Sequence, residues 1–386
     1  MAAKSVTVGQ VDQLLYALRG KSDAKVAGEL SDLELTERVS APRLAHWEAD
    51  SPGSRTREAL IKLADLAAFL NPPAAEVDPV PAPDSGTQDR MLELAAEYVK
   101  TTIARLPNFL ATRETTHFED TPSQQGLLAI RANPLRSHGA PSASDITMSG
   151  SEYKSLHSTG SSSATVTYRD GSEVHGGEAP SKNEVRPSTG LTTNGEFGPI
   201  LSVVIGDVLR SGAAWQRWEQ GAGDPVAVFR YTVSAEQSNY LVKIPVGEKL
   251  DSLYPSYHGE IAIDPATGAI LRISVMAELP PPYQAMQSAI VVEYAPVTIG
   301  EQSYICPVHG VAFSRVPLAH GAAAQDSATV NVQTQLNDVI FTGYHVFRSE
   351  TRILNAASGT DGTNASPQAP APADSTGAAP AEQHPK

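Results

Sequence analysis

The residues that could carry covalent chemistry are few in this chain of 386 residues. Cys306 is the only cysteine, and His309 follows it three positions later. A cysteine nucleophile needs a base within hydrogen-bond reach. Because Pro307 separates the two residues and the segment has the pattern of a β-strand, their side chains are expected on opposite faces. We therefore interpret Cys306 as a small buried hydrophobe, and we expect no internal disulfide and no cysteine-rich metal cluster.

Metal ligation and nucleotide chemistry have no local signal either. The chain has no nucleophile elbow, phosphate-binding loop, H-E-x-x-H or dinucleotide fingerprint. No two histidines stand four residues apart, so a metal site would need side chains from distant segments. The histidines that could supply such a site are His157, His175, His258, His309, His320 and His345. The sequence therefore predicts a protein that is not an enzyme and that holds no cofactor or metal.

Asp264 is the carboxylate that most invites a catalytic role, but its setting is that of a turn. It opens Asp-Pro-Ala-Thr-Gly, in which aspartate bonds backbone amides, proline presets φ and glycine takes a positive φ. Apolar and polar residues alternate on both sides, so 257–278 is predicted to be a β-hairpin. The residues expected to face the core are Ile261, Ile263, Leu271, Ile273 and Val275. Arg272 and Ser274 should face away, which would leave one side of the sheet open to water.

A group of aromatic residues lies just before this hairpin, on strands predicted to be adjacent. Trp215, Trp218, Phe229, Tyr231 and Tyr240 form this group. Core packing explains such a cluster, and the alternative is the lining of a lipophilic cavity. Under that alternative the predicted ligand-binding residues are Trp215, Phe229, Tyr231, Ile261, Ile263, Leu271 and Ile273.

The elements that would position these residues form an α+β domain over residues 87–354. A helix at 87–105 leads into a first strand at about 109–118, and strands at 152–159 and 163–170 surround a turn at Thr159-Gly160. The segment 199–211 is apolar on most faces, as expected of a helix buried against a sheet. Short strands with tight turns follow from 213 onward. This order predicts a strongly curved antiparallel sheet, a half-barrel-like meander with helices packed on one face.

The remaining segments differ in composition. Residues 5–73 have helical periodicity and predict a small all-helical module, in which Thr7 caps a first helix. Residues 74–86 form a Pro-rich linker. We expect a flexible insertion at about 175–195, and a disordered tail at 355–386, which holds no Ile, Leu, Val or Phe.

Charge restricts the partners. The net charge of −14 argues against nucleic acid and against an anionic membrane surface, since both are bound through Lys and Arg. A DNA-binding helix-turn-helix in 5–73 is disfavoured for the same reason. No apolar run approaches the roughly 20 residues of a transmembrane helix. The start lacks the features of a signal peptide. We therefore expect the periplasm or cell envelope if a leader is missing from this sequence, and the cytoplasm otherwise.

Three stretches carry a resemblance to a known family. They are GEIAIDPATGAILRI (259–273), VVEYAPVTIGEQSYICPV (291–308) and FTGYHVFRSETRI (341–353). Their strand rhythm and turns resemble lipoprotein-carrier-like envelope proteins, of the outer-membrane lipoprotein-sorting type, over about residues 90–354. The resemblance implies a curved antiparallel half-barrel with helices across its open side and a cavity for acyl chains. It transfers no ligand-contacting residue, because the shared pattern consists of turns and strand cores.

Two functions are consistent with these observations. The first is non-enzymatic binding of an apolar ligand, a lipid or a lipoprotein segment, between the curved sheet and its helices in the cell envelope. The alternative is a structural or protein-interaction domain with a filled core and no small-molecule ligand. In either case the N-terminal helical module is a candidate surface for a protein partner.

Overall fold

The computed structural model describes residues 4–102, 105–122, 153–170, 172–174, 198–221, 224–246, 249–281, 283, 286–317 and 332–346. Across these ranges the chain has six α-helices and a large antiparallel sheet, which confirms the α+β class. The predicted insertion at 175–195 and the predicted tail at 355–386 lie outside the described residues.

The N-terminal module consists of β1 (Lys4–Val6), α1 (Val8–Ala17), α2 (Asp23–Ser31), β2 (Leu33–Leu35), α3 (Ala41–Ala49) and α4 (Ser54–Leu66). Thr7 caps α1 as predicted: its hydroxyl accepts from the Gln10 amide, and the Gln10 side chain accepts from the Thr7 amide. The module is not entirely helical, because β1 and β2 pair in parallel. Strands of three residues are too short for alternation to be recognised in the sequence.

The module has its own apolar core. Val11, Leu30 and Leu60 are fully buried in it, and Trp47 is nearly so. The predicted linker is partly structured: a 3-10 turn, Ala74–Glu76, precedes β3 (Val77–Asp78), which pairs with β7 at the edge of the main sheet.

The main sheet has the strand order β3-β7-β8-β11-β12-β13-β14-β15-β4-β5-β6, and every neighbouring pair is antiparallel. Its strands are β4 (Phe109–Pro122), β5 (Tyr153–Arg169), β6 (Ser172–Val174), β7 (Ala213–Glu219), β8 (Val226–Val233), β11 (Ser256–Ile263), β12 (Ile270–Glu278), β13 (Gln287–Ile299), β14 (Gln302–Pro317) and β15 (Val332–Val346). Strands β11 to β15 are neighbours in chain order, so the predicted meander is confirmed. A separate hairpin pairs β9 (Val242–Val246) with β10 (Lys249–Leu253).

Strand β5 corrects one prediction. The turn expected at Thr159-Gly160 is absent, and β5 continues through it as a single strand. Thr159 is instead the extra residue of a bulge opposite His117 and Phe118 on β4. A bulge absorbs one residue without reversing the chain, and glycine beside it relaxes the backbone locally.

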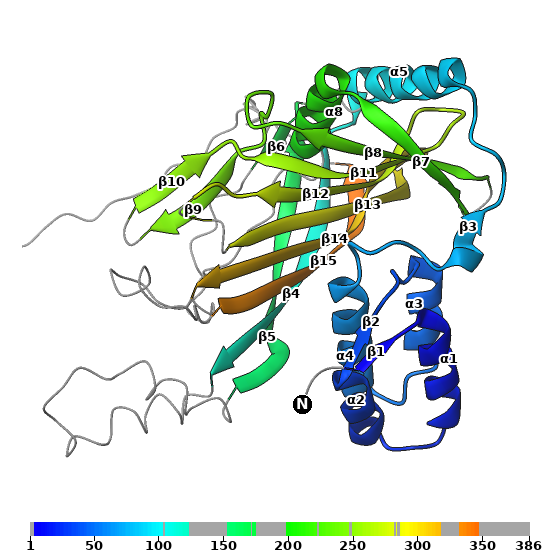
Figure 1. Cartoon of the computed structure of the whole chain (residues 1–386), viewed down its shortest axis with the longest axis vertical. Coiled ribbons are helices and arrows are strands. Elements are labelled where there is room, and N and C mark those ends of the chain that lie inside the picture. Colours follow the sequence, from blue (N-terminus) through cyan, green and yellow to red (C-terminus); the bar gives the residue numbers. More distant parts are fainter. Residues whose placement is uncertain are drawn as a thin grey trace, which may run out of the picture. The chain divides into compact units, whose positions relative to one another are not determined.

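Two helices cover one face of the sheet. Figure 1 shows α5 (Ser85–Thr101) and α8 (Pro199–Ser211) next to each other along the sheet, and the two helices are in contact. Met91, Val204 and Val208 of these helices pack into the main core with Phe229 and Ile273 of the strands. This arrangement confirms the predicted position of the helices on one face.

The opposite face is not simply open to water, contrary to the prediction. Ser274 is 8% exposed on this face. Ile61 and Phe69 of the N-terminal module pack against a small apolar cluster around Leu336, and α4 contacts β15. Alternation along a strand assigns residues to two faces, but it does not say which segment covers each face.

No helix in the described part of the chain combines the length and the hydropathy needed to cross a membrane.

Candidate functional site

Most of the predicted ligand-binding residues lie on the hairpin 257–278. Its turn is as predicted: Asp264 Oδ1 accepts from the Ala266 amide at 2.9 Å, Oδ2 accepts from the Thr267 hydroxyl at 2.7 Å, and Gly268 has φ +75°. Asp264 is therefore a turn residue, as its sequence setting predicts. Cys306 is also as interpreted, fully buried in an apolar cluster with Phe109.

Five of the seven predicted ligand-binding residues lie together beneath α5 and α8. They are Phe229, Tyr231, Ile261, Ile263 and Ile273, and none is more than 2% exposed. Trp215 is at the margin of this core, with its ring edge-on to Phe229 at 5.4 Å. Side chains of both helices fill the space above these residues, so the described structure places packed side chains where the prediction places a ligand.

Leu271 corrects the prediction, because it lies on the other face of the sheet. It packs with Val228 and Ala262, away from Ile273. The pairing of β11 with β12 shifts between Ala262 and Ile263: Ala262 pairs with Arg272 and Ile263 with Ile270, so Leu271 is the extra residue of a bulge. A bulge of this kind places two successive residues on one side and breaks the alternation used to predict the row.

Polar groups within this core bond to one another. The Tyr231 hydroxyl donates to the Ser274 carbonyl oxygen at 2.6 Å. The fully buried Asp207 accepts from the Tyr257 hydroxyl at 2.7 Å and from the Asn239 amide at 2.8 Å. Burial raises the pKa of Tyr240 to about 12. These contacts leave the hydroxyls of Tyr231 and Tyr257 engaged within the fold.

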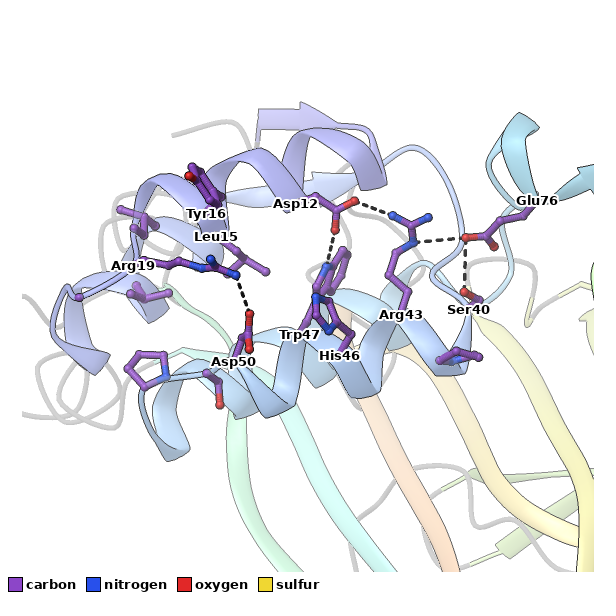
Figure 2. A pocket seen from close by; sticks show the side chains of 16 residues that line it. Asp12, Leu15, Tyr16, Arg19, Ser40, Arg43, His46, Trp47, Asp50 and Glu76 are labelled. Atoms are coloured by element: carbon purple, nitrogen blue, oxygen red, sulfur yellow. Dashed lines mark hydrogen bonds and ion pairs between the residues drawn. The ribbon is translucent and has the colours of Figure 1, made fainter. Parts of the chain in front are cut away.

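A groove of about 630 Å³ lies in the N-terminal module, between α1 and α3. Leu15, Leu18 and Val26 are apolar lining residues, and the Trp47 ring is beside them. Figure 2 shows Tyr16 on α1, and it shows Arg19, shortly after the end of α1, bonded to Asp50, which directly follows α3. Tyr16 is 70% exposed, and the Arg19 guanidinium lies 5.0 Å from the centre of its ring.

A chain of polar contacts stiffens one end of this groove. Asp12 accepts from Trp47 Nε1 at 2.6 Å and from Arg43 Nη1 at 2.5 Å (Figure 2). Arg43 Nε donates in turn to Glu76 at 3.3 Å, and Glu76 also accepts from the Ser40 hydroxyl. The groove therefore joins an apolar floor to a charged rim whose side chains are already held in place.

The sheet face that contacts the N-terminal module carries a band of charged residues. On β7, Glu219 accepts from Arg217, from Arg272 on β12 and from Arg38 of the module. Burial by itself raises the pKa of Glu219, but the three guanidinium groups hold that pKa far below its usual range. Arg217 also bonds Glu260, at 2.7 Å.

This band continues across the sheet to His309 on β14. Asp338 on β15 lies 2.9 Å from His309 Nε2, and Glu293 on β13 lies 3.2 Å from Nδ1. Asp65 of α4 approaches the same Nε2, at 3.8 Å. Burial, followed by the charge of Asp338, raises the pKa of Asp65 well above its usual range. Burial alone lowers the pKa of His309, but the bonds to Asp338 and Glu293 hold it well above the usual value.

Sequence reasoning missed this cluster. His309 is among the histidines for which only distant segments could complete a site, but no sequence pattern points to Asp65 or Asp338. The one usable signal is an ionisable residue at an apolar position: Asp65 directly follows Leu63 and Ala64, which belong to the buried stripe of α4.

Comparisons with protein-family models, with curated proteins and with solved structures found no significant match for this chain.

Proposed function

We propose that this chain is a non-enzymatic binding protein whose N-terminal module holds a segment of a protein partner in the groove between α1 and α3. The observation that carries the proposal is the groove itself, which combines an apolar floor, an exposed tyrosine and a fixed charged rim. Tyr, Trp and Arg are the residue types that dominate binding energy at protein interfaces. Tyr16, Trp47, Arg19 and Arg43 all line this groove.

The shape of the groove favours a helical segment. Two helices flank it, and a third helix can place its side chains between theirs. Helix α1 has ten residues. A partner helix of similar length would present apolar anchors at positions i, i+3 or i+4, and i+7.

Charge favours a basic partner. The groove is lined by more acidic residues (Asp12, Asp50 and Glu76) than arginines (Arg19 and Arg43). The whole chain carries a net charge of −14. Such a field raises the association rate of a basic segment and disfavours an acidic one. We therefore specify the partner as an amphipathic, basic helix.

A selection experiment tests this proposal. A library of helical peptides is selected on the full-length protein, and the selected peptides are measured by fluorescence polarisation. We expect basic amphipathic peptides whose affinity falls at least tenfold in Tyr16→Ala and weakens with salt. Tyr254→Ala is the matched control, because Tyr254 is 56% exposed outside the groove. A failure to select peptides, or equal affinity in Tyr16→Ala, would overturn the proposal.

The apolar-ligand function and the cell-envelope location stay predictions. A lipid beneath α5 and α8 would require one of these helices to move, since the residues predicted to touch it are at most 2% exposed, apart from Trp215 and Leu271. Native mass spectrometry of the purified protein tests this prediction. A co-purifying lipid lost on Phe229→Asp would support it, and a mass equal to the bare chain would count against it.

A further inference from the structure

We propose that Asp65, His309 and Asp338 bind a divalent transition-metal ion of the Zn²⁺ class where α4 contacts the sheet. The three residues come from three elements, α4, β14 and β15. One ligand atom from each lies within 4.8 Å of the other two. The separations from His309 Nε2 are 2.9 Å to Asp338 Oδ1 and 3.8 Å to Asp65 Oδ1.

These separations suit a metal ion with small adjustments. Zn–N and Zn–O bonds of about 2.0–2.2 Å place tetrahedral ligand atoms roughly 3.3–3.6 Å apart. The His309–Asp338 pair would open by about half an ångström and the Asp65–His309 pair would close slightly, by the same geometry. Rotation of the two aspartate side chains about χ2, which is a soft torsion, supplies such movements.

A second observation points to a missing ligand. The Asp65 side chain is 1% exposed, and its Oδ2 atom has no hydrogen-bond partner in the described structure. A buried carboxylate oxygen without a partner carries a large desolvation cost. A metal ion bound between Asp65 and His309 would neutralise that carboxylate and coordinate it.

Glu293 prepares His309 for this role. Its Oε2 atom lies 3.2 Å from His309 Nδ1. In the tautomer with the proton on Nδ1, Nδ1 donates a hydrogen bond to Glu293. The lone pair of Nε2 is then directed toward Asp65 and Asp338. A carboxylate on the far nitrogen of a metal-binding histidine fixes the tautomer and the orientation of the ring in this way.

The donor set selects the class of metal. One imidazole nitrogen with carboxylate oxygens suits Zn²⁺, Fe²⁺ or Mn²⁺, whereas Ca²⁺ and Mg²⁺ favour sites made only of oxygen. Three protein ligands leave a fourth position for water. Because Asp65 belongs to the N-terminal module and the other ligands to the sheet, the ion would fasten the two together.

Metal binding by the untagged, full-length protein tests the proposal. After removal of metals by chelation, Zn²⁺ is titrated against a chromophoric chelator, and bound metal is counted by mass spectrometry. We expect one Zn²⁺ per chain and a rise in the melting temperature with Zn²⁺. Asp65→Asn and Asp338→Asn should each weaken binding by more than about 100-fold. Glu293→Gln should weaken it by about 10-fold to 100-fold.

The controls separate this site from adventitious binding and from unfolding. Asp65→Asn keeps the size of the side chain, and circular dichroism would verify that the fold is retained. His258→Gln is the matched control, because His258 pairs at 3.2 Å with the exposed Glu278 and, among the residues that the structure describes, no third ligand group joins them. Substoichiometric Zn²⁺ in the wild type, or equal affinity in wild type and Asp65→Asn, would overturn the proposal.

Discussion

Arg38 of the N-terminal module donates a hydrogen bond of 2.8 Å to Glu219 at the end of strand β7, and the two side chains are only 10% and 8% exposed. Arg217 and Arg272 converge on the same carboxylate. Glu219 is therefore the shared acceptor that joins the module to the sheet. Buried ion pairs contribute little compared with apolar packing, but the loss of one partner leaves a buried charge uncompensated.

Glu219→Gln should be severely destabilising for that reason. It leaves three guanidinium groups around a neutral amide, and we expect a loss of about 3–5 kcal/mol in the free energy of unfolding. Arg38→Met should cost less, about 1–3 kcal/mol, because Glu219 keeps two partners. Arg19→Met is the control, since the Arg19–Asp50 pair is more than half exposed on the arginine side and should contribute less than about 1 kcal/mol. Urea unfolding followed by tryptophan fluorescence gives these values, and equal effects for Glu219→Gln and Arg19→Met would contradict the assignment.

The same carboxylate should make stability depend on acid pH. The pKa of Glu219 is depressed in the folded chain, so its contribution is fully present above the unfolded value of about 4.5 and is lost as the pH falls toward the folded value. The difference in unfolding free energy between wild type and Glu219→Gln should therefore be largest at neutral pH and shrink below pH 4.5. Glu278→Gln, at an exposed position, is the control. A difference that stays constant from neutral to acid pH would argue against this role for Glu219.

Gly268→Ala should test the contact between the hairpin turn and α5. Gly268 has φ +75°, and an added Cβ would lie 2.4 Å from the Leu94 backbone. Gly20 has a similar φ of +77° with nothing within 4 Å, so Gly20→Ala isolates the backbone strain, about 1–2 kcal/mol. Gly268→Ala should cost about 1–3 kcal/mol more, because α5 must move away from the turn. Thermal unfolding of the two variants compares their stabilities. Equal losses of stability would show that α5 moves away from the turn without an energetic penalty.

Cys306 should be inert in the folded protein. Burial raises the pKa of its thiol to about 12, and the residue is fully buried. Reaction with a disulfide reagent at pH 8 should be at least about 100-fold slower in the native chain than in denaturant, because only the exposed thiolate reacts. Ala235→Cys introduces a thiol at an exposed position and should react at once. Rapid labelling of Cys306 in the native wild type would show that this core opens readily.

Local features of the fold could be predicted from the sequence because nearby residues determine them. The Thr7 cap, the Asp264–Gly268 turn and the apolar helix α8 each depend on contacts within a few residues. Alternation also identified the strands of the meander and the core-facing positions of Ile261, Ile263 and Ile273. A bulge defeats this reasoning at Leu271, since one extra residue exchanges the two faces without any change in composition.

Only the tertiary structure decided what covers each face and which ionisable groups meet. Arg38 and Glu219, or Asp65 and His309, lie far apart in the chain, and no spacing rule relates them. Their encounter depends on how the N-terminal module contacts the sheet. Composition and periodicity determine which elements form and which side of each is apolar, because those preferences act over a few residues. The pairing of buried charges depends on the packing of whole elements, and that packing brings together the groups proposed to bind metal.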